Sequence, residues 1–336
     1  MSAALDYQAV LSVYPDDCQP SAVEFLDAAG GLSGARLWRL TTPRGPLLLR
    51  RWPQEHPTRE RLEFIQAVLW HVQQEGFARV SLPLETREHR GYVERADYLW
   101  ELAPWLPGVS DYRQAPNARR LANALRTLAE FHLAAATFPL AEPVQCPAPG
   151  IAERHEQLQE LLAGGFDRLR EALQPARDEY RESAERIVEL FPRAAPRVRA
   201  ALEQAARARV QVVPCLRDIW HQNVLFEGDE VTGLIDFGSL RPENVSADVA
   251  RLLGSMAEDD RALWREGFAA YESRRPLSES EAILTSAFDS SGVLLGGINW
   301  LSWIYERGRK FDHPAAVLER LGYFQRRLGV LAAGSL

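Results

Sequence analysis

The sequence predicts an α+β protein of two lobes, a small N-terminal lobe built on an antiparallel sheet and a larger, mainly helical C-terminal lobe. Short apolar runs separated by turn residues fill residues 22–51, which is typical of neighbouring strands. Helical periodicity dominates residues 117–208 and 246–336. The change of pattern places the lobe boundary near Ala103, so the expected lobes are residues 1–103 and 104–336.

The N-terminal lobe is expected to contain a three-stranded meander, one helix and two further strands. The strand-like runs are Ala22 to Leu26, Arg36 to Leu40 and Leu47 to Arg51. Apolar residues at helical spacing follow Thr58 and stop at Gly76, a residue that commonly ends helices. Residues 92–105 then predict two more strands.

The C-terminal lobe is expected to be helical with three breaks and one hairpin. Proline and glycine predict the breaks at residues 139–150, 164–165 and 192–196. Within the lobe, Val224 to Phe226 and Val231 to Ile235 flank the turn sequence EGDE. Two short apolar runs around such a turn predict a β-hairpin.

Composition and charge exclude several classes of function. The 336 residues carry a net charge of −7 and a pI near 5.6, so the basic surplus of a nucleic-acid-binding protein is missing and no nucleic-acid partner is expected. Lys310 is the single lysine, and it lies outside any G-x-x-x-x-G-K-[ST] motif, which excludes a Walker-type ATPase.

The sequence also indicates a protein of a reducing, aqueous compartment. No run of about 18 apolar residues occurs, and the N-terminus lacks a basic segment followed by an apolar one, so we expect a cytoplasmic protein with no membrane partner. Cys18, Cys146 and Cys215 are far apart and lack C-x-x-C spacing. They are therefore expected to be reduced cysteines that pack rather than form disulfides or a zinc site.

Residues 215–238 contain the pattern that indicates chemistry. Asp218 precedes Asn223 by five positions, and the predicted hairpin separates Asn223 from the sequence Asp236-Phe237-Gly238. Phosphoryl transfer needs a carboxylate that orients the attacking hydroxyl, together with a second carboxylate and an amide oxygen that hold Mg²⁺. The alternative is that Asp218 is a solvated loop residue and Asp236 a turn former.

This pattern resembles that of the aminoglycoside phosphotransferase and choline kinase-like family, small-molecule relatives of the protein kinases. The family pattern is H-G-D-x-x-x-x-N, a hairpin and D-F-G, whereas this chain has Leu216-Arg217-Asp218 in place of His-Gly-Asp. The resemblance implies a bilobal protein kinase-like fold, ATP and Mg²⁺ as cofactors, Asp218 as catalytic base, and Asn223 and Asp236 as Mg²⁺ ligands. Because the usual histidine is missing, we expect the loop to be held in another way.

The resemblance also implies phosphate-binding residues in the N-terminal lobe. Gly31, Ser33 and Gly34 lie where the family has its phosphate-covering loop, although an ordinary glycine-rich hairpin would look the same. Arg50 occupies the strand position of the usual lysine, and a guanidinium can bind phosphate oxygens with two parallel hydrogen bonds. The alternative is that Arg50 covers the sheet surface. Arg51 faces the opposite side of the strand.

Three further residues are assigned by the same resemblance to nucleotide binding. Glu63, preferred over Glu60 one helical turn away, is the expected partner of Arg50, although both glutamates could be solvated helix residues. The backbone groups of Glu101 and Ala103 would bind the adenine edge, unless these residues are simply the end of an amphipathic strand.

The remaining candidates are given structural roles. Asp248 matches a family aspartate that braces the catalytic loop, and His132 and His221 are expected to be packing or loop histidines. The aromatic residues from Trp300 to Tyr305 lie at helical spacing, which favours a core position, but in the family the late helices border the acceptor pocket.

Two functional hypotheses result. The first is a phosphotransferase that uses ATP and Mg²⁺ to phosphorylate a hydroxyl of a small-molecule acceptor. The second is a catalytically weak or inactive kinase-like binding module, suggested by the absent loop histidine and strand lysine. The identity of the acceptor, the choice between ATP and GTP, and the oligomeric state stay open.

Overall fold

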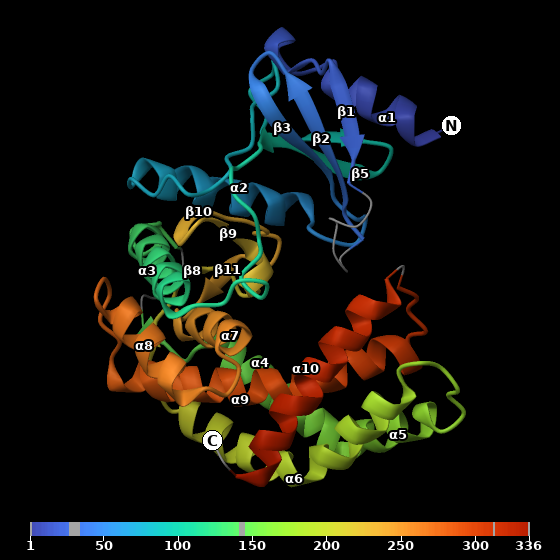
Figure 1. Cartoon of the computed structure of the whole chain (residues 1–336), viewed down its shortest axis with the longest axis vertical. Helices are drawn as coiled ribbons and strands as arrows, with labels where there is room; N and C mark the ends of the chain where they lie inside the picture. Colours follow the sequence, from blue (N-terminus) through green and yellow to red (C-terminus); the bar gives the residue numbers. More distant parts are fainter. Residues whose placement is uncertain (1, 27–33, 141–144, 312, 335–336) are drawn as a thin grey trace. The chain divides into compact units, whose positions relative to one another are not determined.

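A computed structural model describes residues 2–26, 34–140, 145–311 and 313–334, with side chains from Tyr7 onward (Figure 1). The chain divides into two compact units. The first contains residues up to Tyr112 together with 222–240, and the second contains 113–221 and 241–336.

The first unit is built on an antiparallel sheet of five strands in the order β1-β2-β3-β5-β4 (Figure 1). The predicted meander and the two later strands are confirmed. The bounds are β1 Ala22–Phe25, β2 Arg36–Thr42, β3 Gly45–Arg51, β4 Val93–Arg95 and β5 Tyr98–Pro104.

One face of this sheet forms a core with the N-terminal helix α1 (Ser2–Leu11) and the segment that follows it. Alternate residues of β2 and β3 are buried, as expected for strands with one covered face. The rings of Trp38 and Trp100 stack with their centroids 5.4 Å apart. The buried members of this core are Val10, Leu11, Tyr14, Cys18, Trp38, Leu40, Leu47, Leu49, Trp100 and Leu102.

The helix predicted after Thr58 is α2, Arg59–Gln74. The Thr58 side chain accepts a hydrogen bond from the backbone N–H of Arg61, which caps the first turn. The buried residues recur at helical spacing along one side, and the chain leaves the helix at Gly76, whose φ of 93° suits glycine.

The predicted hairpin is confirmed as β9 (Val224–Glu227) and β10 (Glu230–Leu234). It belongs to the first unit because its backbone is hydrogen-bonded there. Val109 and Phe226 exchange two N–H to O=C bonds of 3.0 and 2.9 Å, and the N–H of Leu234 donates to Arg79 O at 2.9 Å. The same contacts extend the first unit to Tyr112, beyond the expected boundary at Ala103.

The second unit is mainly helical (Figure 1). Helices α6, α9 and α10 pack against one another, α3 packs against α8, and α7 against α9. The helices are α3 Ala118–Ala135, α4 Pro149–Glu160, α5 Phe166–Leu173, α6 Arg181–Ala205, α7 Ser246–Met256, α8 Arg261–Glu272, α9 Glu279–Leu301 and α10 Pro314–Ala333. Two small sheets pair β6 (Gln145–Cys146) with β7 (Val210–Gln211) and β8 (Val213–Cys215) with β11 (Arg241–Glu243).

Two of the three predicted helix breaks are confirmed, and the third is wrong. Between Ala135 and Pro149 the described residues form no helix, and Gly164, with φ of 117°, interrupts the path between α4 and α5. In contrast, α6 continues through Pro192 and Pro196, both of which lie on its exposed side. The opposite side of α6 is buried against α9 and α10, and this packing outweighs the local preference of proline.

Across the described ranges, no helix combines the length and apolar character needed to cross a membrane. The three cysteines are free thiols, with Cys18 and Cys215 buried and Cys146 partly buried, in agreement with their predicted packing role.

We expect Leu49→Ala to lower the free energy of unfolding by about 2–5 kcal/mol, because it opens a cavity in the core of the first unit. Leu49 is fully buried, whereas Val23 on β1 is 37 % exposed. Val23→Ala is the control and should change stability by less than about 1 kcal/mol. Urea unfolding followed by tryptophan fluorescence measures both, and equal effects of the two changes would contradict this description of the core.

Candidate active site

The loop that carries Asp218 follows β8 and is held by a buried carboxylate from another element. Asp248, in the first turns of α7, accepts the backbone N–H of Leu216 at 2.7 Å and that of Arg217 at 2.6 Å. His132 on α3 contacts the same carboxylate through Nε2 at 3.1 Å. The predicted bracing role of Asp248 is therefore confirmed. Because Asp248 bonds backbone groups, the loop is held without a histidine at position 216.

Arg217 compensates in a different way for the missing glycine. Its φ of 68° lies in the left-handed region, which costs a residue other than glycine roughly 1–2 kcal/mol. The guanidinium is fixed by carboxylates on both sides, with Nη2 donating to Glu153 at 2.7 Å and Nη1 donating to the buried Glu243. These ion pairs and the bond to Asp248 hold arginine in a conformation that glycine adopts easily.

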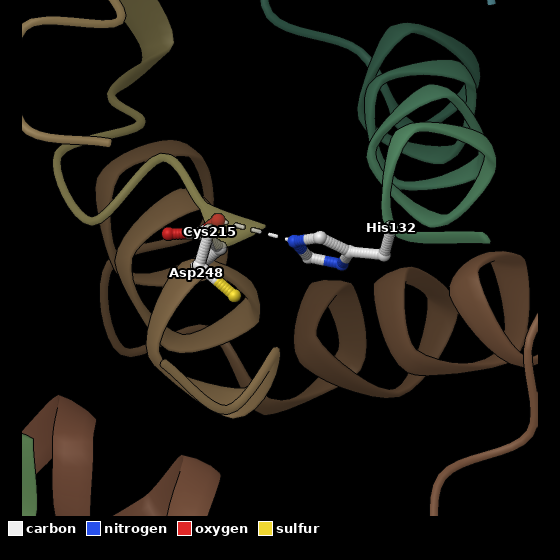
Figure 2. Close-up of side chains that lie close together, drawn as sticks. All are labelled: His132, Cys215 and Asp248. Atoms are coloured by element: carbon white, nitrogen blue, oxygen red, sulfur yellow. Dashed lines mark hydrogen bonds and ion pairs between the residues drawn. The ribbon is translucent and has the colours of Figure 1, made fainter. Parts of the chain in front are cut away.

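His132, Asp248 and Cys215 form a buried polar cluster (Figure 2). All three offer atoms that can bind metals, but each of these atoms is already hydrogen-bonded. Nδ1 of His132 lies 2.7 Å from the Tyr271 hydroxyl, and Cys215 Sγ donates to Glu243 O at 3.3 Å. Burial raises the pKa of the Cys215 thiol well above its usual value, so it stays protonated. We therefore describe this cluster as the brace of the loop and not as a metal centre.

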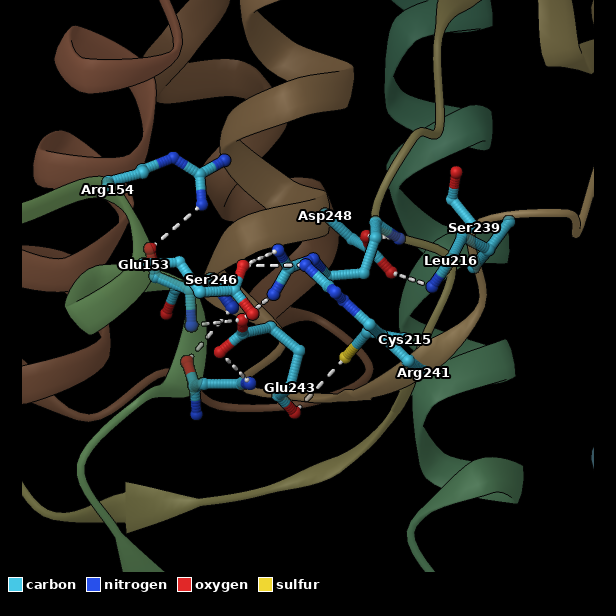
Figure 3. A network of polar contacts seen from close by, with 12 residues as sticks. Glu153, Arg154, Cys215, Leu216, Ser239, Arg241, Glu243, Ser246 and Asp248 are labelled. Carbon is cyan, nitrogen blue, oxygen red and sulfur yellow. Dashed lines mark hydrogen bonds and ion pairs between the residues drawn. The ribbon is translucent and has the colours of Figure 1, made fainter. Parts of the chain in front are cut away.

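A network of ion pairs continues from this brace (Figure 3). Glu243, which is fully buried, accepts hydrogen bonds from Arg217 and, at 2.7 Å, from the N–H of Gly150 at the start of α4. Glu153 on α4 also binds Arg241 at 2.6 Å. The loop before Asp218 is thus connected to α4, α7 and β11 of the second unit, which limits its motion.

Asp218 itself is partly exposed and paired with a guanidinium. Its side chain is 54 % exposed, and Oδ1 accepts hydrogen bonds from Nε and Nη2 of Arg251 at 3.1 and 2.8 Å. Arg251 lies on α7 one turn after Asp248, so one helix fixes both the backbone of the loop and its carboxylate. Sequence reasoning missed Arg251, although its i+3 spacing from Asp248 places both residues on the same side of a helix.

Asn223 and Asp236 lie together at the open end of the β9–β10 hairpin in the first unit. Val224 pairs with Leu234, and the next residue, Ile235, donates its N–H to Asn223 O at 3.0 Å. Asp236 directly follows with φ of 64°, a region that aspartate tolerates better than most residues. The hairpin therefore brings a carboxamide and a carboxylate to one end, and their oxygen atoms match the preference of Mg²⁺.

Arg50 on β3 lies close to the Asp236-Phe237-Gly238 segment. Its guanidinium covers the ring of Trp52 at 4.5 Å, and a Cβ added to Gly238 would lie 3.1 Å from that same ring. Trp52 Nε1 is buried and has no hydrogen-bond partner among the described residues. Arg50 thus lies near this segment through Trp52, and its role in phosphate binding stays a prediction.

The carboxylate near Arg50 is Glu101 and not the predicted Glu63. Arg50 pairs with Glu101 across β3 and β5, and its positive charge opposes the effect of burial, which raises the pKa of Glu101. Gln66 on α2 donates to Glu101 at 2.9 Å. Glu63 instead accepts a hydrogen bond from the Tyr92 hydroxyl at 2.7 Å. Sequence reasoning missed Gln66, because the family resemblance suggested only a glutamate of this helix as the partner.

The strand register does not fit the adenine-binding role predicted for the backbone of Glu101 and Ala103. Hydrogen bonds at the two ends of the β3–β5 ladder, to Leu99 O and from the N–H of Trp105, fix which pairs are hydrogen-bonded. Antiparallel pairs alternate, so the N–H and C=O groups of Glu101 and Ala103 face β3. The sheet already uses these groups, and this assignment needs correction.

Of the predicted phosphate loop, Gly31 and Ser33 fall outside the described residues. Gly34 is described and has φ of 82°, a conformation that glycine adopts without strain.

The late aromatic residues are divided between core and surface. Trp300 is 7 % exposed and contacts the rings of Trp303 and Phe311, whereas the Tyr305 hydroxyl donates to Asp178 at 2.9 Å. His221, for which no chemical role was predicted, is buried, and its backbone N–H donates to Ser255 at 3.0 Å.

The chain is similar to known proteins both in sequence and in fold. Residues 24–282 match the family described as "Phosphotransferase enzyme family". A homoserine kinase from Gluconobacter oxydans (strain 621H) is 31 % identical over 252 residues, covering 66 % of this chain and 79 % of the relative.

Solved structures give the same fold at lower identity. An aminoglycoside phosphotransferase from Alicyclobacillus acidocaldarius superposes with a TM-score of 0.66 at 19 % identity, over 97 % of this chain and 94 % of that one. A spectinomycin phosphotransferase in complex with ADP and spectinomycin superposes with a TM-score of 0.67 at 11 % identity, over 98 % of both chains. The predicted protein kinase-like fold is confirmed.

The buried His132 predicts a loss of stability in acid. Burial lowers its pKa, with Arg275 acting in the same direction and Asp248 and Glu281 opposing. As the pH falls through about 6.5, His132 therefore becomes protonated in the unfolded chain but stays neutral in the folded chain. The free energy of unfolding is fully present above that pH and decreases below it. The expected contribution is at most about 1.4 kcal/mol per pH unit.

His132→Gln removes this titration. We expect the variant to be less stable at pH 8 but to lose less stability than wild type between pH 6.5 and 5. Urea unfolding at each pH measures the difference. Parallel pH curves for the two proteins would show that folding leaves the pKa of His132 unchanged, and would contradict this prediction.

Proposed function

Since this chain belongs to the phosphotransferase enzyme family, we propose that it transfers the γ-phosphoryl group of ATP, with Mg²⁺, to a hydroxyl of a small molecule. The chain is a kinase whose acceptor is an alcohol group; ATP, Mg²⁺ and the residue roles are the proposed part. The observation that carries them is the fixed position of Asp218, on a loop held by Asp248 and paired with Arg251.

Asp218 is proposed as the catalytic base. Its carboxylate accepts a hydrogen bond from the acceptor hydroxyl and takes the proton as the oxygen attacks phosphorus. The new O–P bond forms while the bond between the γ-phosphorus and the bridging oxygen breaks, and ADP leaves. Arg251 keeps the carboxylate in one orientation, so little conformational freedom is lost when the acceptor binds.

Asn223 and Asp236 are proposed to hold Mg²⁺. Both offer oxygen ligands, and the hairpin fixes their backbones through the hydrogen bond from Ile235 to Asn223. When bound, the ion neutralises charge on the phosphate oxygens. Among the described residues the two side chains fit this role by ligand type and by position in the hairpin.

Arg50 is proposed to bind the phosphates of the nucleotide. It replaces the usual lysine with a group that stays charged at every physiological pH and can donate two hydrogen bonds to one phosphate. The stacking on Trp52 orients the guanidinium, and Glu101, held by Gln66, supplies the nearby negative charge. The connection between α2 and β3 thus runs through a glutamine and a strand glutamate.

The alternative function is a kinase-shaped binding module without activity. It rests on the absent loop histidine and strand lysine. Other residues can take over both roles in this chain, since Asp248 holds the loop through backbone groups in place of the histidine, and Arg50 supplies a cation in place of the lysine. The enzyme is therefore the better supported function.

We expect Asp218→Asn to lower kcat by about 10²–10⁴-fold, because the amide cannot accept the proton, and to leave the affinity for ATP near wild type. Asp167→Asn is the control, since Asp167 is 73 % exposed on α5. Coupled ADP release measures turnover, and calorimetry with and without Mg²⁺ measures nucleotide binding. Full activity of Asp218→Asn would show that Asp218 is not the catalytic base. Nucleotide binding that is absent or independent of Mg²⁺ would favour the inactive module.

Arg50→Ala should raise the KM for ATP by about 10–100-fold, the effect of losing a charge-assisted hydrogen bond to phosphate. Arg51→Ala is a matched control on the neighbouring position, because Arg51 stacks on Tyr98 at 4.0 Å and points to the other face of the strand. Steady-state kinetics with varied ATP distinguish the two. Equal KM values for wild type and Arg50→Ala would show that Arg50 does not bind the nucleotide and only covers the sheet surface.

A further inference from the structure

Three arginines from separate elements of the second unit gather around Trp220, two residues after Asp218 in the same loop. Arg251 on α7 covers the Trp220 ring at 4.4 Å, and Arg320 on α10 covers it at 3.9 Å. Arg113, which precedes α3, lies 5.8 Å from the ring of Tyr323, and that ring packs edge-on against Trp220 at 4.9 Å. We call Arg113, Arg251 and Arg320 the arginine cluster.

The carboxylates of this region do not neutralise the arginine cluster completely. Arg251 is paired with Asp218, and Arg113 with Glu258 and Glu319 at 3.2 and 3.3 Å. The neighbouring Arg326 shares Glu258 with Arg113, and Arg327 pairs with Asp259 and Asp289. Arg320 is different, since within the described part of the chain it forms neither a hydrogen bond nor an ion pair.

Arg320 is nevertheless held in place and partly buried. Its guanidinium lies on the indole of Trp220, which is itself 5 % exposed. Burial and the like charges of Arg251 and Arg113 lower the pKa of Arg320 to about 10, while Asp218 opposes this shift. The residue therefore stays charged at neutral pH. A partly buried cation that no carboxylate contacts directly is unfavourable, and an anion bound beside it would relieve the cost.

We infer that the arginine cluster, through Arg320, binds an anionic group of the acceptor, a carboxylate or a phosphate monoester, while Asp218 takes the proton of its hydroxyl. This inference rests on the proposed function and names the class of substrate. Arg251 contacts both Asp218 and Trp220, so the hydroxyl and the anionic group are bound at neighbouring positions. The acceptor is therefore a compact hydroxy acid or phosphorylated alcohol, and a polycationic aminosugar is disfavoured.

Acceptor pairs that differ only in the anionic group test this directly. L-Homoserine is compared with homoserinol, in which an alcohol replaces the carboxylate, and glycerol 3-phosphate is compared with glycerol. Kanamycin serves as a polycation. The inference expects a kcat/KM at least tenfold higher for one anionic member than for the analogue that lacks the anionic group, and which pair responds distinguishes carboxylate from phosphate. Equal use of both members in each pair, or a preference for kanamycin, would overturn it.

Variants of Arg320 then locate the effect. Arg320→Gln should raise the KM for the anionic acceptor about 10–100-fold, as expected for a lost charge-assisted hydrogen bond, while kcat and the KM for ATP change little. Arg320→Lys keeps the charge and should recover part of the loss. Arg193→Gln, an exposed arginine of α6 paired with Glu189, is the control and should match wild type. A raised KM for ATP with an unchanged acceptor KM would show that Arg320 serves the nucleotide instead.

Binding without turnover separates this inference from the proposed function. Calorimetry measures binding of L-homoserine and of glycerol 3-phosphate to wild type and to Arg320→Gln in the absence of nucleotide. If no acceptor is phosphorylated, binding of either anion that is lost in Arg320→Gln still supports the site, although the proposed function fails. If wild type binds neither probe, or if Arg320→Gln binds equally well, the inference is wrong even where phosphorylation occurs.

Discussion

The buried carboxylate of Asp248 is the constraint on which the conformation of the Asp218 loop in the second unit depends. It accepts hydrogen bonds from two backbone N–H groups of the Asp218 loop and lies 3.1 Å from Nε2 of His132. Hydrogen bonds from several donors to one buried charge are strong, and removing any of them would leave polar groups unpaired. Together with the ion pairs of Arg217, this anchor holds the loop in its conformation, including the left-handed backbone at Arg217.

In the first unit, too, a few contacts hold the residues with a proposed function. The Asn223 and Asp236 side chains depend on a short hairpin that is hydrogen-bonded to the rest of the unit at Val109 and Arg79. Arg50 depends on an aromatic ring beneath it and on a strand neighbour of opposite charge. In both units, the side chains with a proposed function are thus oriented by partners that come from different elements of the same unit.

Sequence patterns predicted the architecture well because the patterns are local. Strand alternation, the Thr58 cap and the hairpin turn all act within a few residues, and each was found where expected. The exception in the helices, the continuous α6 across Pro192 and Pro196, depends on burial against α9 and α10, which no local rule contains.

The partners of the site residues were harder to predict because they depend on register and on distant contacts. Glu63 and Gln66 are both on α2, and only the position of β5 decides that Gln66 reaches Glu101. The hydrogen-bonding direction of Glu101 and Ala103 depends on which pairs of an antiparallel ladder are bonded, and composition says nothing about that. Arg320 is separated from Asp218 by about a hundred residues of sequence, so its place beside Trp220 emerges only from the fold.

The way in which Asp248 grips main-chain atoms has a consequence for divergence. An anchor that bonds only backbone groups does not require a histidine at position 216, and this chain has leucine there. Signatures written around the tripeptide His-Gly-Asp would overlook such chains. In this chain the loop is marked instead by Asp248, in the first turn of the following helix, and by Arg251 one turn later.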